Sequence, residues 1–235
     1  MSFGDWDHQI RGTVSSGLEL TNAIVGSGSL KDGNFTGGNL TDQTNTHHLN
    51  NTFTRGLTKG RIRTLYGKEH TTTDSRTGPG IYCMCDNLDP ANNSSDYYWF
   101  GLEHGVTNQL RLVIAKGVGT TLNGALNWTF PGGADTLIAS AAVITGFTLG
   151  ETIPFQLEWN LDLASFGGVR LTASVGLVGD TNFSNLAVVY DIIDSTSPLT
   201  TSLIEGIGMM WPIGAPGIDD GEHTLWDSTG VFQLV

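Results

Sequence analysis

The sequence predicts an all-β protein, folded as a sandwich or barrel of short antiparallel strands. Short apolar runs recur along most of the 235-residue chain, and clusters of turn-forming residues separate them. Glycine is abundant, at 32 residues, and charged residues make up only 14% of the chain, as expected for strands joined by tight turns. No long stretch repeats its apolar residues at the helical period, so we expect little helix.

The first 52 residues are the least regular part of the sequence. Weak strand patterns cover residues 6–14 and 17–25, whereas residues 26–51 are rich in Gly, Ser, Thr and Asn and are predicted as long loops. We find no repeat and no linker that would divide the chain. The sequence therefore predicts one β-sandwich domain over residues 1–235, with residues 1–52 as irregular N-terminal strands and loops.

Clear strand patterns begin after residue 53. Alternation over residues 61–67 stops at a glycine, and residues 80–86 form a short run of the buried type. Residues 97–103 and 109–115 are separated by a few turn formers, so we expect them to pair as a hairpin.

The next strand, residues 153–162, has two chemically different faces. Phe155, Leu157, Trp159 and Leu161 alternate with polar residues on one face, and we expect Trp159 on this face to lie in the core. The opposite face carries Gln156, Glu158, Asn160 and Asp162. Four further strands are expected over residues 168–176, 187–193, 204–211 and 230–235.

The order of these segments resembles a known superfamily. The segments are Gly60-Arg61-Ile62, Gly80-Ile81-Tyr82, Tyr98-Trp99-Phe100-Gly101-Leu102, Leu110-Arg111-Leu112, Pro154 to Trp159, Val169 to Val175 and Gly206-Ile207-Gly208, with Asp227 and Phe232 in the last strand. Over roughly residues 55–235 they resemble the concanavalin A-like lectins and glucanases, which include laminin G-like modules. The resemblance implies a two-sheet antiparallel jelly-roll β-sandwich. Because the superfamily holds lectins, carbohydrate-binding modules, glucanases, adhesive modules and accessory domains of virus particles, the fold does not decide the activity.

Charge and cysteine content exclude several classes of function. The formal net charge of −12 argues against binding to nucleic acid or to a negatively charged membrane surface. Cys83 and Cys85 are two apart in a predicted strand, so their side chains would share a face about 6.6 Å apart, a poor geometry for a disulfide. We expect both to be small buried apolar residues.

The polar face of residues 153–162 is the best candidate for catalysis. Related glucanases carry acidic residues at alternate positions of one strand, and the resemblance points to Glu158, Asn160 and Asp162. Asn160 interrupts this set, and Glu158 and Asp162 would lie about 13 Å apart in a regular strand unless a bulge shortened it. Glycosidases need their two carboxyl groups within about 5–9.5 Å of each other. We therefore expect no enzyme activity and an exposed polar face.

A binding face is predicted on the hairpin. If Tyr98, Phe100 and Leu102 point inward, then Tyr97, Trp99 and Glu103 point outward beside Arg111. Flat aromatic rings beside polar groups suit a glycan or a protein interface. The alternative is that the two faces are reversed, or that loops cover both. Glu158, Asn160 and Asp162 complete the set of candidate binding residues.

Calcium is a weaker possibility. Oxygen donors gather at Asp86 and Asp89, and again at Asp219 and Asp220, but neither group has the spacing of an EF-hand. Acidic turns are usually only solvated, so we expect no cofactor.

Two functional hypotheses remain. The first is a non-enzymatic virion protein, such as a phage capsid decoration or tail accessory protein, which binds other chains and forms a homo-oligomer. Met1 is not followed by an apolar signal segment, so such a protein would be made in the host cytoplasm and released with the particle. The second is a stand-alone extracellular glycan-binding module or a β-glucanase-like hydrolase.

Overall fold

The computed structural model describes most of the chain after residue 55 and several short strands before it. The described residues are 6–11, 19–21, 34–36, 46–51, 56–68, 78–88, 94–104, 109–120, 136–148, 151–210 and 224–233. Side chains are described for residues 56–66, 80–88, 94–102, 109–119, 138–148 and 151–206. Within these residues the regular structure is entirely β, and no helix is long and apolar enough to cross a membrane.

The larger of two main sheets has eight strands. Its order is β1-β4-β14-β6-β7-β8-β10, and β9 also pairs with β8. The bounds are β1 Trp6–Arg11, β4 Thr46–Asn51, β6 Gly78–Cys85, β7 Ser95–His104, β8 Gln109–Thr120, β9 Thr136–Ala139, β10 Val143–Thr145 and β14 Ile204–Met210. The expected hairpin is β7 and β8, in which Glu103 lies opposite Arg111.

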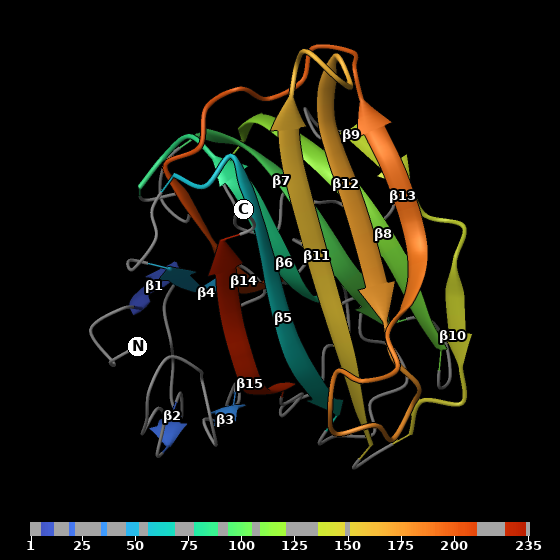
Figure 1. Ribbon diagram of the computed structural model, residues 1–235. Helices are drawn as coiled ribbons and strands as arrows, with labels where there is room; N and C mark the ends of the chain where they lie inside the picture. The colour runs from blue at the N-terminus through green and yellow to red at the C-terminus, as the bar shows by residue number, and fades with distance from the viewer. Residues whose placement is uncertain are drawn as a thin grey trace.

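The second sheet has five strands and lies in front of the first in Figure 1. Its order is β13-β12-β11-β5-β15, with bounds β13 Ala187–Asp194, β12 Gly168–Val175, β11 Thr152–Asp162, β5 Lys59–Lys68 and β15 Thr224–Gln233. A separate small sheet joins β2 (Glu19–Thr21) to β3 (Asn34–Thr36). Neighbouring strands run antiparallel throughout, so the predicted two-sheet antiparallel fold is confirmed.

The core lies between the two sheets and follows the alternation of the sequence. Phe155 and Leu157 are buried, and Trp159 is only 1% exposed. The Trp159 indole N–H donates a hydrogen bond to the Leu57 carbonyl oxygen at 2.7 Å, so the one polar atom of this ring is satisfied. Phe100 of the other sheet meets Phe155 edge to face, with ring centroids 6.0 Å apart. The predicted apolar face of β11 is therefore confirmed as core.

Some strands lie where the sequence predicts loops or no strand at all. β3 and β4 fall within residues 26–51, which were predicted as loops, and that prediction is wrong there. The β4 sequence Thr-His-His-Leu-Asn-Asn lacks apolar alternation, yet its backbone pairs with β1 on one side and β14 on the other. The strand is defined by this pairing, and its sequence carries no alternation by which it could be predicted.

The two cysteines are buried and free, as expected, but they do not share a face. Cys83 belongs to the core between the sheets, whereas Cys85 belongs to a second apolar cluster. Between them Met84 has a φ of +55°, and the pairing of β14 with β6 shifts at this position. Such a β-bulge inserts one extra residue and reverses the alternation that follows it.

Candidate functional site

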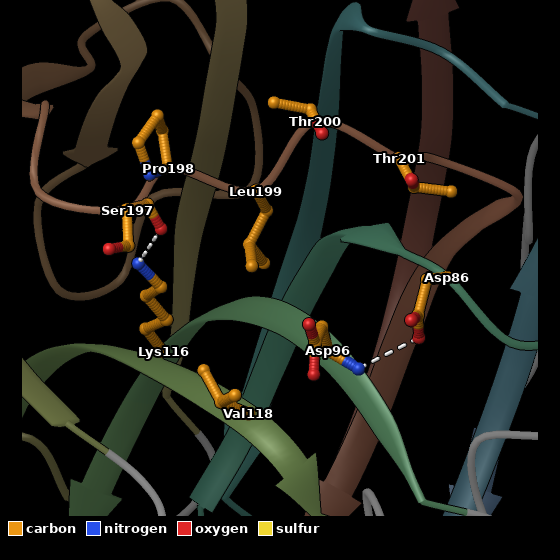
Figure 2. Close-up of a pocket in the computed structure, with 9 residues that line it drawn as sticks. All are labelled: Asp86, Asp96, Lys116, Val118, Ser197, Pro198, Leu199, Thr200 and Thr201. Carbon is orange, nitrogen blue, oxygen red and sulfur yellow. Dashed lines mark hydrogen bonds between the residues drawn. The ribbon is translucent and has the colours of Figure 1, made fainter.

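A pocket of about 270 Å³ opens where segments from both sheets meet (Figure 2). The eight-stranded sheet contributes Asp86, just after β6, Asp96 on β7, and two residues of β8. The connection from β13 to β14 forms the opposite wall. The lining residues are Asp86, Asp96, Lys116, Val118, Ser197, Pro198, Leu199, Thr200 and Thr201.

A buried lysine holds the connection in place. The Lys116 ammonium donates to Asp194 Oδ2 at 2.7 Å and to the backbone carbonyl oxygens of Thr196, at 3.2 Å, and Ser197, at 2.5 Å. An ammonium has three N–H donors, so all of them are used. The side chains of Lys116 and Asp194 are each only 10% exposed, and each neutralises the charge of the other.

Tyr98 extends this network to the same carboxylate. Its hydroxyl donates to Asp194 Oδ2 at 2.6 Å and accepts a hydrogen bond from the Leu199 backbone N–H at 3.1 Å. Burial raises the pKa of the Tyr98 phenol, and the hydrogen bond to the Asp194 carboxylate raises it further. The phenol is therefore a fixed donor at neutral pH.

The wall of the pocket contains a strained residue. Ser197 has a φ of +53°, in the left-handed region that residues with a Cβ seldom adopt. The bond from Lys116 to its carbonyl oxygen holds this conformation. The lysine therefore sets the shape of the wall from which Leu199 points into the pocket (Figure 2).

Two aspartates line the other side of the pocket, and backbone N–H groups orient both. Asp86 Oδ1 accepts a hydrogen bond from the Asp96 N–H at 2.8 Å, and Asp96 Oδ1 accepts one from the Gly119 N–H at 2.7 Å. No described residue bonds to the second oxygen of either carboxylate or forms an ion pair with it. Each aspartate therefore offers one acceptor of fixed orientation to a ligand.

The rest of the lining combines hydroxyl groups with apolar surface. Ser197, Thr200 and Thr201 are exposed and carry hydroxyls, while Leu199, Pro198 and Val118 supply carbon atoms. A pocket of this composition suits a small ligand with several hydrogen-bond donors and an apolar face.

The polar face of β11 lines a different pocket, of about 320 Å³, on the outer side of the five-stranded sheet. The structure brings Glu158 and Asn160 together there with Lys59, Arg170 and Thr172. Glu158 Oε1 already accepts bonds from Gln156, at 3.0 Å, and Arg61, at 3.4 Å. The Glu158 carboxylate in this pocket is therefore already bonded within the protein.

Asp162 does not join Glu158 and Asn160. Its Oδ1 accepts hydrogen bonds from the backbone N–H groups of Ala164, at 3.0 Å, and Ser165, at 2.8 Å, in the turn after β11. Hydrogen bonds from Ser165 lower the pKa of this carboxyl. The register of β11 with both neighbours is continuous, so no bulge shortens the roughly 13 Å of strand between Glu158 and Asp162.

The outward aromatics of the hairpin are not at the surface. Tyr98, Phe100 and Leu102 do point into the core, as expected, but Tyr97 and Trp99 are fully buried on the other face of the sheet. Both belong to an apolar cluster with Tyr82, Cys85, Val113, Ala115 and Ile204. The expectation of an exposed aromatic surface is therefore wrong.

Two glycines allow Trp99 to lie close against the sheet. A Cβ added at Gly80 or Gly101 would overlap the Trp99 indole, so the ring occupies the space of two missing side chains. Arg111 is half-buried beside this face, and the Glu103 side chain lies outside the described residues.

One of the weak calcium candidates lies in the first pocket. Asp86 lies there beside Asp96, whereas Asp89, Asp219 and Asp220 lie outside the described residues. Across the described part of the chain, no three His, Cys, Asp or Glu side chains form a group that could hold a metal ion.

Sequence reasoning missed Asp96, Lys116 and the 197–201 wall. Each is unremarkable in its own segment, and only the fold brings them together. The short distance between Asp86 and Asp96 in the sequence is the one local signal.

Comparisons with known proteins identify the fold. No protein-family model matches the chain, and no curated protein matches its sequence. Among solved structures, the VIP36 exoplasmic/lumenal domain in its Ca²⁺/Man3GlcNAc-bound form matches with a TM-score of 0.54 and 16% identity, over 98% of this chain and 84% of that one. A Lotus tetragonolobus seed lectin matches with a TM-score of 0.53 and 9% identity, over 100% of this chain and 96% of that one.

A weaker match is a GH131 β-glucanase catalytic domain from Podospora anserina, with a TM-score of 0.44 and 11% identity, over 86% of this chain and 72% of that one. At this level of similarity the match has no weight in the argument. The identities are too low to transfer a site or an activity, but the lectins agree with the observed pair of antiparallel sheets. The chain has the concanavalin A-like jelly-roll fold.

Proposed function

We propose that the protein is a non-enzymatic carbohydrate-binding protein and that the pocket around Asp86 and Asp96 holds one sugar residue. The observation that carries this proposal is a pair of aspartates, each with one carboxylate oxygen bonded to a backbone N–H and one without a described partner. They share the pocket with hydroxyl groups and with the apolar side chain of Leu199. A sugar ring has hydroxyl groups along its edges and C–H groups on its faces, so it needs acceptors and apolar surface together. This lining supplies both.

The character of the similar proteins supports the ligand class. One VIP36 structure holds Ca²⁺ and Man3GlcNAc, and the Lotus protein is a seed lectin. The proposal for this chain rests on its own pocket, because the residues of those lectins are not matched to it one by one.

The absence of catalysis is part of the proposal. The Glu158 carboxylate accepts hydrogen bonds from Arg61 and Gln156, and the Asp162 carboxylate accepts one from the Ser165 backbone N–H in the turn after β11. Their separation of about 13 Å along the strand exceeds the roughly 5–9.5 Å that glycosidases need. These observations support a face that does not hydrolyse glycosidic bonds.

Binding can be tested by titrating monosaccharides and short oligosaccharides, with calorimetry for affinity and backbone NMR for the location of the site. Asp86→Asn and Asp96→Asn should each weaken binding about tenfold or more, since a hydrogen bond to a charged group contributes about 1.5–3 kcal/mol. Glu151→Gln is the matched control, because it removes one negative charge from the turn before β11.

Three outcomes would contradict the proposal. One is a chain that binds no saccharide, and another is binding that both variants retain. The third is release of reducing ends from β-glucans that Glu158→Gln or Asp86→Asn abolishes, because it would make the protein an enzyme.

A second proposal concerns the biological setting. We propose that the protein functions as one of many copies in a virion, as a decoration or tail accessory protein. Two apolar side chains on the outer face of the edge strand β13 support a protein contact: Val188 is 61% exposed and Ile193 is 47% exposed. Light scattering after gel filtration should then find oligomers that a Val188→Lys/Ile193→Lys variant does not form. A wild-type chain that stays monomeric at high concentration would contradict this second proposal.

A further inference from the structure

We infer that the sugar residue held by this pocket carries a free amino group and binds as an ammonium ion. The inference rests on the proposed function and names its ligand class more closely. It follows from the balance of charge inside the cavity, which is uneven from one wall to the other.

The positive charge in the lining is already neutralised. Lys116 donates its three N–H groups to Asp194 and to two backbone carbonyl oxygens. Asp194 in turn accepts from Tyr98 as well as from Lys116, so the pair is fully bonded within the protein. A ligand therefore meets neither a free ammonium donor nor an unbalanced positive charge on this side.

The described residues do not neutralise the negative charge in the lining. Among the described residues neither Asp86 nor Asp96 has a cationic partner, and each keeps one carboxylate oxygen free of protein hydrogen bonds. The two carboxylates accept N–H groups of neighbouring strands, so they are held in place before a ligand arrives. A cationic ligand group beside either carboxylate would supply a charge partner that the described lining does not.

An ammonium suits this arrangement better than a hydroxyl group. Hydrogen bonds between ionised partners are roughly twice as strong as neutral ones. The chain also carries a net charge of −12, which favours positive ligands and opposes acidic sugars.

The remaining lining distinguishes an amino sugar from a bare cation. Leu199 and Val118 present carbon atoms to the cavity, and Thr200 and Thr201 carry hydroxyl groups on the wall across from the two carboxylates (Figure 2). A metal ion gains nothing from contact with apolar side chains. A pyranose ring can pack its C–H groups against such side chains and bond its hydroxyls to threonines.

The test compares three probes that differ at one position: glucosamine, glucose and N-acetylglucosamine. Calorimetry at about pH 6, where an amine with a pKa near 7.7–8.0 is charged, should show that glucosamine binds about tenfold more tightly than either neutral sugar. That preference should fall as the pH rises through the pKa of the amine. Backbone NMR should show the largest shifts at Gly119 and Thr200.

Matched variants separate a site from general attraction to an acidic protein. Asp86→Asn and Asp96→Asn keep an acceptor oxygen for the backbone N–H, but they should weaken glucosamine binding more than they weaken binding of the neutral sugars, and so reduce the preference to about twofold or less. Glu151→Gln should retain it, because about 35 Å of β11 separates the Glu151 turn from the strand end beside Asp194.

The outcomes distinguish this inference from the function on which it rests. If no sugar binds, both fall. If neutral and amino sugars bind equally, or if Glu151→Gln loses the preference as completely as Asp96→Asn, the protein is a lectin but the inference is wrong. Loss of glucosamine binding on removal of calcium by a chelator would also overturn it, because a metal would then fill the space assigned to the ammonium.

Discussion

Trp99 owes its position to residues that lack a side chain. The ring lies over Gly80 and Gly101, is fully buried, and belongs to an apolar cluster outside the main core. Alternation assigned it correctly to the face opposite Phe100, but alternation distinguishes only the two faces of a strand. Whether a face is exposed to water depends on which other segments cover it, and the sequence of the strand does not predict that.

Replacing Trp99 with alanine should therefore destabilise the protein. Loss of a large buried aromatic costs about 3–5 kcal/mol, and denaturant unfolding measures this free energy directly. Trp99→Phe should cost less, because it leaves a smaller void and no described residue accepts a bond from the indole N–H. An unfolding midpoint unchanged in Trp99→Ala would mean that the ring is exposed after all.

Lys116 shows how a buried charge can shape a binding wall. Lys116→Met should lower the free energy of unfolding by about 3–5 kcal/mol, because it leaves the Asp194 carboxylate buried without its partner. Hydrogen exchange of residues 195–203 should also accelerate. In the wild type, Lys116 on β8 donates two hydrogen bonds to this segment and a third to Asp194, the last residue of β13. Adding Ser197→Gly to the Lys116→Met variant should reduce both the loss of stability and the faster exchange, because glycine adopts a φ of +53° without strain. Unchanged exchange in Lys116→Met would show that residues 195–203 keep their conformation without the lysine.

At the scale of single strands, the pair β12 and β13 is joined by an exposed ion pair. Arg170 donates to both carboxylate oxygens of Asp191, at 2.7 and 2.6 Å, and these bonds lower the pKa of Asp191. A carboxyl group whose pKa is lower in the folded chain than in the unfolded chain stabilises the fold above the unfolded value of about 3.9. That contribution is lost as the pH falls through the folded value.

The melting temperature of the wild type should therefore fall as the pH drops from about 5 to 2, and Asp191→Asn should fall less. Asp162 and Glu151 also have a lowered pKa, so some dependence will remain in the variant. Because the Asp191 pair is exposed, high salt should reduce the difference between the two proteins. Parallel curves at low salt would show that the pair does not contribute to stability.

Strands could be predicted from the sequence where one face is apolar and the other polar. β11 is such a strand, and its buried face agrees with the pattern. β4 could not be predicted, because its sequence lacks the apolar alternation by which a strand is recognised. The side of the sheet on which Cys85 lies could not be predicted either, since one residue at positive φ, Met84, reverses the alternation.

At the scale of the whole molecule, the pocket exists only because two sheets meet. Asp96 and Lys116 come from the eight-stranded sheet, and Leu199 comes from the connection that leaves the five-stranded one. The sequence therefore predicts the layers but not the site, whose residues are spread from Asp86 to Thr201. A pattern confined to one strand cannot show which strand ends will face each other.

Because the pocket is built from segments of both sheets, ligand binding should be coupled to the stability of the whole fold. A ligand that binds only the assembled sandwich should stabilise it by about 2.7 kcal/mol at a hundred times its dissociation constant. Glucosamine should therefore raise the melting temperature and slow hydrogen exchange in residues 195–203. In Lys116→Met both effects should shrink at the same sugar concentration, because part of the binding energy must first order the wall around Ser197. Equal shifts in the two proteins would mean that the lysine stabilises the fold but does not prepare the pocket for its ligand.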